Sequence, residues 1–139
     1  MILRTSWVYS AQGKNFLKTI LKLAESHASL NIVCDQIGAP TAARLIAETT
    51  AHILRQPSTG TFHLSAQGET SWMGFAEFII KLCQLTTKIR GISTEQYPSP
   101  AKRPANSRLN SQALCERFEL ELPRWERDVE VTTHLVIGG

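Results

Sequence analysis

The sequence predicts an α/β protein, because short apolar runs typical of strands alternate with amphipathic segments typical of helices. The expected order is strand, helix, strand, helix, strand, helix, strand, loop, helix, helix. No internal repeat, low-complexity tract or flexible linker interrupts this order. We therefore expect residues 1–139 to fold as a single unit.

Four extended segments are expected. Residues 2–9 are apolar enough to be buried on both faces of a sheet. The next three extended segments are expected at residues 30–34, 61–64 and 91–97. The first begins without a polar lead-in, whereas chain termini are usually polar and frayed, so we expect that further polypeptide once preceded it.

Helices are expected between these strands and in the last part of the chain. Phe16 to Ala24 has apolar side chains at helical spacing and a lysine stripe on the other side. Thr41 and Ser71 are the expected N-caps of the second and third helices. Asn110 is the expected N-cap of the fourth, and Pro123 occupies the favoured first position of the last.

Composition excludes several classes of protein. Fifteen Lys and Arg against 12 Asp and Glu give a net charge of +3, too small and too scattered for a nucleic-acid-binding surface. No apolar run reaches the roughly 18 residues that span a bilayer. No secretory signal is visible either, so we expect a cytoplasmic protein. Cys34, Cys83 and Cys115 are odd in number and far apart, and are expected to be reduced, buried thiols.

Several motifs for catalysis and cofactor binding are missing from the sequence. A dinucleotide site needs a glycine-rich turn between strand and helix, and there is no G-x-G-x-x-G or Walker sequence. A serine nucleophile elbow and a Cys-x-x-Cys pair are also missing. The four histidines share no ligand spacing, so no metal site is expected.

Three loops carry more polar and aromatic side chains than a connection requires. The first comprises residues 4–9 with 14–16, the second residues 35–41 and the third residues 103–110. In open α/β folds ligands bind beyond the carboxyl ends of the strands, where the first two loops would lie. Three prolines between residues 98 and 104 stiffen the approach to the third loop and reduce the entropy lost when it is ordered.

These segments, in this order, resemble the dTDP-4-dehydrorhamnose reductases, a family of extended short-chain dehydrogenases. The shared motifs are R-T-S-W-V-Y, G-K-N-F, D-Q-x-G-x-P-T, G-x-x-H-L, R-P-x-N-S-R-L-N and L-P-x-W. They run through essentially the whole chain but cover only about the C-terminal half of such an enzyme. The resemblance implies the substrate-binding portion of an extended Rossmann-type reductase, with the N-terminal dinucleotide-binding part absent. Residues 1–9 would then be a strand of the missing sheet.

The resemblance implies the substrate-binding half of an enzyme that reduces dTDP-4-dehydro-L-rhamnose to dTDP-L-rhamnose, for cell-surface polysaccharide, with NADPH or NADH. In the family, the tyrosine of a Tyr-x-x-x-Lys pair protonates the developing alkoxide. Here Gly13 follows Tyr9 at that spacing and Ala101 follows Tyr97, so we expect no catalytic residue, bound cofactor or reduction in this chain alone. Two alternatives stay open: a non-catalytic nucleotide-sugar-binding or regulatory subunit of the same superfamily, and a truncated product acting as an interaction module.

The resemblance also implies which side chains bind the dTDP-sugar. Trp7 matches a sugar-contacting tryptophan, and the alternative is a core tryptophan. Asn15 and Gln36 offer amides to sugar hydroxyls or to the thymine edge, or equally cap a turn. In the third loop guanidinium groups suit diphosphate oxygens, and the alternative is a solvated basic loop. The substrate-binding residues expected there are Arg103, Asn106, Ser107 and Arg108.

Other residues of the first two loops have lesser expected roles. Thr5 and Ser6 are expected at the boundary between cofactor and substrate, or bonded to backbone. Asp35 is expected to cap or turn the chain, and Gly38 to adopt a positive φ. A strand at residues 1–9 without its neighbours would leave an open sheet edge, so we expect the chain to self-associate.

Overall fold

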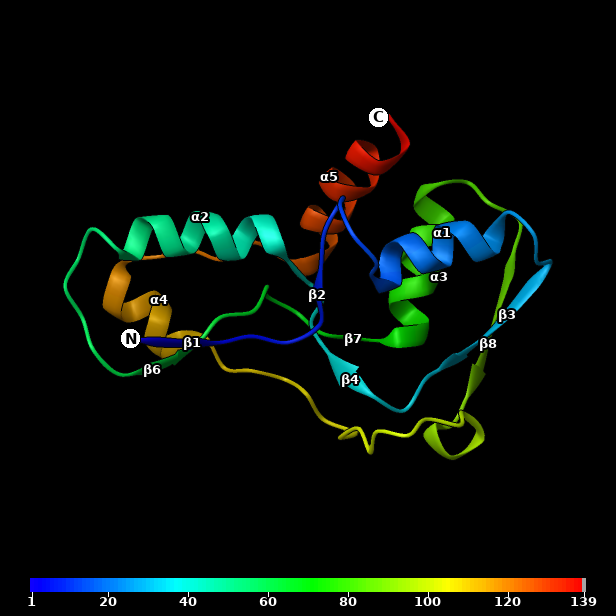
Figure 1. The fold of residues 1–139 in the computed structure, drawn as a ribbon, viewed down its shortest axis with the longest axis horizontal. Helices are drawn as coiled ribbons and strands as arrows, with labels where there is room; N and C mark the ends of the chain where they lie inside the picture. The colour runs from blue at the N-terminus through cyan, green and yellow to red at the C-terminus, as the bar shows by residue number, and fades with distance from the viewer. Residues whose placement is uncertain (139) are drawn as a thin grey trace.

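In a computed structural model, which describes residues 1–138, short strands alternate with helices (Figure 1). The predicted α/β class is confirmed. The elements are, in chain order, β1 (Ile2–Arg4), β2 (Val8–Tyr9), α1 (Phe16–Ala24), β3 (Ser29–Val33), β4 (Ile37–Gly38), β5 (Thr41–Ala42), α2 (Ala43–Ile53), β6 (Thr61–His63), β7 (Thr70–Ser71), α3 (Trp72–Leu82), β8 (Lys88–Ile92), the 3₁₀ helix η1 (Thr94–Gln96), α4 (Gln112–Phe118) and α5 (Trp125–Ile137).

Two parallel strand pairs lie at opposite ends of the molecule in Figure 1. At one end β1 pairs with β6, with Leu3 opposite Phe62, and α2 and α4 lie beside this pair. At the other end β3 pairs with β8, with Leu30 opposite Ile89, and α1 and α3 pack against it. Parallel neighbours require long connections, and these run through the helices.

The short strands in the middle connect the two ends. β2 pairs with β5 in parallel, and β4 pairs with β7 antiparallel. The segment between β8 and α4, yellow in Figure 1, returns along one side of the molecule past β4. There Ile37 donates its backbone N–H to Ala105 at 2.8 Å and accepts one from Ser107 at 2.8 Å. The third polar loop is thereby joined to the second as if it were a further strand.

One cluster of buried apolar side chains includes residues from all five α-helices. Its fully buried members include Leu17 of α1, Phe75 of α3, Leu114 of α4 and Val129 of α5. Phe75 meets the ring of Trp125 edge to face, with centroids 6.0 Å apart. No helix in residues 1–138 is both long and apolar enough to cross a membrane.

The first predicted strand is wrong in its continuity. Trp7 has a φ of 51°, in the left-handed region, and this splits residues 2–9 into β1 and β2. Ile2 and Val8 are 59% and 48% exposed, which agrees with the apolar patch expected where this segment lacks its neighbours, although its apolar pattern is that of a strand buried on both faces. The pattern of apolar residues alone does not reveal the break at Trp7.

Two neighbours pack against the indole of Trp7 and so stabilise the left-handed backbone conformation of this residue. It stacks on Trp72, with ring centroids 3.7 Å apart and planes 10° from parallel. It also lies against the backbone of Gly38, where an added Cβ would be 2.6 Å from Trp7 Cε2. The positive φ predicted for Gly38 is wrong, since the residue is absent from those with positive φ. Glycine is needed there because of the close approach of the indole.

The fourth predicted strand is misplaced. The structure has β8 at Lys88–Ile92 and then the 3₁₀ helix η1, where an extended segment over 91–97 was expected. Ser93 and Gln96 form a capping box that turns the chain. Charged residues in β8 obscure its alternation in the sequence, so the prediction begins too late.

The predicted N-cap Ser71 is confirmed, because its hydroxyl accepts the backbone N–H of Gly74 at 3.0 Å. Thr41 is not an N-cap: it lies in β5, and its hydroxyl donates to the carbonyl of Ala39 and accepts from the N–H of Ala66. The second helix therefore begins at Ala43.

The last two helices begin later than predicted. Asn110 accepts the N–H of Gln112 at 2.8 Å, but α4 begins at Gln112 and its N-cap is Ser111. The last helix begins at Trp125, two residues after Pro123. Pro123 instead accepts a backbone hydrogen bond from Gln67 at 2.8 Å, which joins this turn to the loop before β7.

The expectation that all three cysteines are buried is wrong for Cys34, which is exposed. Its thiol donates to the carbonyl of Ile92 at 3.3 Å. Cys83 and Cys115 are half-buried, and burial raises the pKa of both thiols. All three are free of disulfides.

A buried carboxylate connects α5 to α2. Asp128 is 2% exposed, and its Oδ1 accepts a hydrogen bond from Arg44 Nη2 at 3.0 Å, while its buried Oδ2 has no partner. Burial raises the pKa of Asp128 above its usual value, and the Arg44 guanidinium offsets only part of this effect. Burial and the nearby charge of Asp128 also raise the pKa of the Tyr9 hydroxyl.

Asp128→Asn is expected to flatten the dependence of stability on pH. Because the folded-state pKa of Asp128 is raised, its favourable contribution is full below the ordinary Asp pKa and is lost as pH rises through the folded value. The unfolding free energy of the native protein should thus decrease as pH rises above about 4, and that of the variant should decrease less. Urea unfolding across this range measures both slopes, with Glu25→Gln at an exposed site as control. Parallel slopes for the native protein and the Asp128→Asn variant would contradict the assignment.

Gly38→Ala is expected to destabilise the protein by about 1–3 kcal/mol, because the new Cβ would displace the Trp7 indole. The penalty should shrink in a Trp7→Ala background, where the space is vacant. Urea unfolding of the four proteins of this cycle measures the coupling. An equal penalty in both backgrounds would show that the indole contact is not its cause.

Candidate functional site

A cavity of about 280 Å³ lies where the three polar loops meet. It contains residues of all three, although these loops are far apart in the sequence. Five of its seven lining residues were among the predicted site residues. The complete lining is Ser6, Trp7, Gln36, Trp72, Arg103, Pro104 and Ser107.

Backbone contacts bring the loops together. The two hydrogen bonds of Ile37 hold residues 105–107 beside β4. The hydroxyl of Ser6 donates to the carbonyl of Ser107 at 3.3 Å, which joins the first loop to the third. These contacts hold the three loops side by side around the cavity.

Gln36 occupies the centre of a side-chain network in this wall. It is 6% exposed, and its Oε1 accepts from Trp72 Nε1 at 3.1 Å while its Nε2 donates to Thr94 Oγ1 at 3.1 Å. Thr94 donates its hydroxyl to Asp35 at 2.6 Å and its backbone N–H to the same carboxylate at 3.0 Å. These hydrogen bonds lower the pKa of Asp35. Of the two expected roles, a cap or a turn, Asp35 thus has a capping contact: it accepts hydrogen bonds from Thr94, the first residue of η1.

The cavity favours ligands with hydrogen-bond acceptors and negative charge. Its polar side chains are the Arg103 guanidinium, the Gln36 amide and the hydroxyls of Ser6 and Ser107, and no carboxylate is among the lining residues. A guanidinium can only donate hydrogen bonds. The two stacked indoles supply an apolar surface beside these donors.

Asn15 and Thr5 are not among the cavity residues. Asn15 caps α1: its Oδ1 accepts the N–H of Lys18 at 3.2 Å, and its Nδ2 donates to the carbonyl of Ser10 at 2.7 Å. Of the two roles considered for Asn15, the structure thus has the capping one. Thr5 is exposed and does not line the cavity, whereas its neighbour Ser6 does.

Asn106 and Arg108 also lie outside the cavity lining and bind each other. Asn106 Oδ1 accepts the backbone N–H of Arg108 at 3.0 Å. The Arg108 guanidinium forms a two-pronged ion pair with Glu69, with Nη2 3.0 Å from Oε1. Hydrogen bonding to Arg108 lowers the pKa of Glu69. This pair fastens the third loop to the segment before β7.

Trp72 and Pro104 are cavity residues that the sequence did not single out. Trp72 is the first residue of α3, directly after the N-cap Ser71, and its neighbour Phe75 carries the apolar pattern of the helix. Because Trp72 directly follows the N-cap, it lies at the N-terminal end of α3. This position in the sequence is the signal that could have marked Trp72 as a site residue. Pro104 was interpreted only as a stiffener of the loop.

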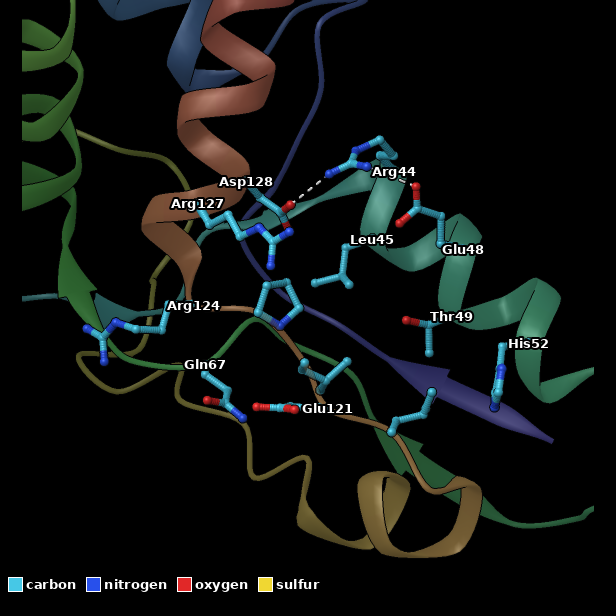
Figure 2. Close-up of a pocket in the computed structure, with 13 residues that line it drawn as sticks. Arg44, Leu45, Glu48, Thr49, His52, Gln67, Glu121, Arg124, Arg127 and Asp128 are labelled. Atoms are coloured by element: carbon cyan, nitrogen blue, oxygen red, sulfur yellow. Dashed lines mark hydrogen bonds and ion pairs between the residues drawn. The ribbon is translucent and has the colours of Figure 1, made fainter.

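A second, larger cavity of about 840 Å³ lies between α2, α5 and residues 120–124 (Figure 2). None of the predicted site residues lines it. Figure 2 shows Arg44 of α2 reaching Asp128 of α5, and Arg44 also pairs with Glu48 at 3.0 Å. Arg124 pairs with Glu126 at 2.9 Å. Because its lining includes the carboxylates of Glu48, Glu121 and Asp128, this cavity suits an anion less than the smaller one, whose lining contains no carboxylate. In residues 1–138, no three His, Cys, Asp or Glu side chains gather as metal ligands would.

Comparison with known proteins connects the chain to one family. A family model described as RmlD substrate binding domain matches residues 1–136. The dTDP-4-dehydrorhamnose reductase of Burkholderia thailandensis is 45% identical over 139 residues, which cover 88% of this chain and 47% of that protein.

Solved structures agree with the sequence matches. The crystal structure of a dTDP-4-dehydrorhamnose reductase from Clostridium acetobutylicum superposes with a TM-score of 0.92 at 34% identity, over 98% of this chain and 48% of that one. The Bacillus anthracis dTDP-4-dehydrorhamnose reductase in complex with NADP gives a TM-score of 0.89 at 32% identity, over 94% and 46% of the two chains. The chain therefore spans about half the length of the relatives it matches. The resemblance inferred from the loop motifs is confirmed, and the chain belongs to the RmlD substrate-binding domain family.

Proposed function

We propose that this chain is the substrate-binding portion of a dTDP-4-dehydrorhamnose reductase and that its 280 Å³ cavity receives part of the dTDP-sugar. One observation carries the proposal: three loops that are remote in sequence converge on a cavity lined by hydrogen-bond donors and indoles. The reductases to which the chain is similar are named for a dTDP-linked deoxysugar.

The lining residues have chemistry that suits each part of such a ligand. The Arg103 guanidinium would bind diphosphate oxygens. The indole of Trp7, supported by its stack on Trp72, would contact the apolar surface of a deoxysugar. Ser107 would bind hydroxyl or carbonyl oxygens of the sugar, and the Gln36 amide would bind an oxygen of the same nucleotide sugar. Asn106 and Arg108 would act indirectly, by holding the loop that carries Arg103 and Ser107.

We expect binding without reduction in this chain alone. Reduction needs a hydride from NADPH or NADH and a proton donor at the keto oxygen. Tyr9 is in the core and Tyr97 is exposed, and neither lines the cavity. A dinucleotide site needs a glycine-rich turn between a strand and a helix, and this expectation is supported by Gly13, Gly60 and Gly68, the described glycines with positive φ, which lie in separate turns. The cofactor would be bound by the remainder of the reductase, with Ser6 at the boundary.

Isothermal titration calorimetry tests this function. The chain is expected to bind dTDP weakly and NADPH not measurably. Arg103→Ala should weaken dTDP binding by about tenfold, through loss of a charge-assisted hydrogen bond. Arg55→Ala, at another exposed arginine outside the cavity, is the matched control and should bind as the native chain does. Binding of NADPH more tightly than dTDP would overturn the proposal.

Self-association through β1 is a separate expectation. In residues 1–138, β1 pairs with β6 alone, and Ile2 is among the exposed large apolar residues. A free edge beside exposed apolar side chains favours pairing with another strand. Analytical ultracentrifugation is expected to show dimers or larger species, reduced by Ile2→Lys but not by Lys22→Ala on the outer side of α1. A monomer at high concentration would contradict this expectation.

A further inference from the structure

We propose that Gln36 is a fixed hydrogen-bond donor to an acceptor oxygen of the bound nucleotide sugar, oriented by a chain of hydrogen bonds on both sides of its amide. The inference rests on the proposed function, since it concerns the same cavity. It adds to that function that the site offers a hydrogen-bond donor, and not an acceptor, at Gln36. The two positioning contacts come from η1 and from the start of α3.

The carboxylate of Asp35 fixes the hydroxyl proton of Thr94. Thr94 Oγ1 lies 2.6 Å from Asp35 Oδ1, and the backbone N–H of Thr94 lies 3.0 Å from both carboxylate oxygens. An ionised carboxylate can only accept hydrogen bonds. Thr94 must therefore donate its hydroxyl proton to Asp35, which leaves its oxygen as an acceptor toward Gln36.

The two neighbours of the Gln36 amide demand the same orientation. Thr94 Oγ1, whose proton points to Asp35, requires a donor, and this is Gln36 Nε2 at 3.1 Å. On the other side the indole of Trp72 can only donate, so the atom 3.1 Å from its Nε1 must be Oε1. A reversed amide would place two donors against each other at Trp72 and two acceptors at Thr94. The orientation is thus determined by chemistry at both ends.

One amide proton of Gln36 remains for a ligand. The Nε2 group has two N–H donors, and the described residues provide an acceptor only at Thr94. Gln36 is almost fully buried and lines the cavity beside Trp7, Trp72 and Arg103. A buried donor without a partner is unfavourable, so this position selects an acceptor oxygen and rejects an apolar group. Trp72 has two functions: it supports Trp7 by stacking and Gln36 by its N–H.

Calorimetry with dTDP-L-rhamnose tests whether Gln36 and Thr94 act together. Gln36→Leu should weaken binding by about three- to tenfold, the usual effect of one hydrogen bond. Thr94→Val, outside the cavity lining, should also weaken binding, and Thr94→Ser should restore it because the hydroxyl returns. The double variant Gln36→Leu/Thr94→Val should bind no more weakly than Gln36→Leu. Additive losses, or equal binding by the Val and Ser variants, would overturn the proposal.

Three ligands distinguish the source of the acceptor oxygen. If Gln36→Leu weakens only dTDP-L-rhamnose, the acceptor belongs to the sugar. If it weakens dTDP equally, the acceptor is a phosphate oxygen, and if it weakens thymidine as well, it belongs to the nucleoside. If the native chain binds these ligands and Gln36→Leu weakens none of them, the inference is wrong although the proposed function stands.

A measurement without ligand separates this inference from the function on which it rests. The indole N–H of Trp72 is expected to exchange with solvent more slowly in the native chain than in Gln36→Leu, as followed by NMR. Thr94→Val should shift the side-chain amide resonances of Gln36, and Thr94→Ser should shift them much less. Unchanged Trp72 exchange and unchanged Gln36 resonances would overturn the hydrogen-bonded chain, even if dTDP binds. If dTDP fails to bind while these NMR effects appear, the proposed function fails and the orientation of Gln36 stands.

Discussion

Two backbone hydrogen bonds at Ile37 are the interaction on which the rest of the site depends. They hold residues 105–107 against β4, more than sixty positions away in the chain. Without them the segment that carries Arg103 and Ser107 would be held to the rest of the site only by side-chain contacts, the Ser6 hydroxyl on Ser107 and the Arg108–Glu69 ion pair. Backbone pairing suits this purpose, because it fixes position without using the side chains that face the ligand.

The clamp between Arg108 and Glu69 adds to this attachment from the other side of the segment. Both partners are largely exposed, so their ion pair contributes little stability by itself. Its value lies in geometry, since a guanidinium and a carboxylate joined by two parallel hydrogen bonds permit few relative orientations. Of the two arginines in this loop, Arg103 therefore lines the cavity and Arg108 holds the backbone in place.

Much of the site could be predicted because its residues lie in contiguous motifs. Ser6, Trp7, Gln36, Arg103 and Ser107 all line the cavity, and each stands in a loop with a recognisable pattern. Arg108 carries the same charge as Arg103 but pairs with Glu69, a partner 39 positions earlier that no local pattern reveals. Trp72 was missed for a similar reason, since its contacts with Trp7 and Gln36 exist only in the folded chain.

The fold was predictable in class but less so in its boundaries. Periodicity located α1 and α3, whose apolar faces are well defined and whose N-caps bond locally. Threonine is a residue type typical of N-caps, yet the Thr41 hydroxyl is hydrogen-bonded to the backbone of Ala39 and Ala66. The turn at Trp7 depends on stacking with Trp72 and on the missing side chain of Gly38, neither of which is adjacent in the sequence.

The left-handed turn at Trp7 has a mechanical consequence. Only Thr5 and Ser6 separate the last residue of β1 from this indole, and the two rings beside the cavity are in face-to-face contact. A displacement of β1 would therefore reach the stacked indoles beside the 280 Å³ cavity through only two intervening residues.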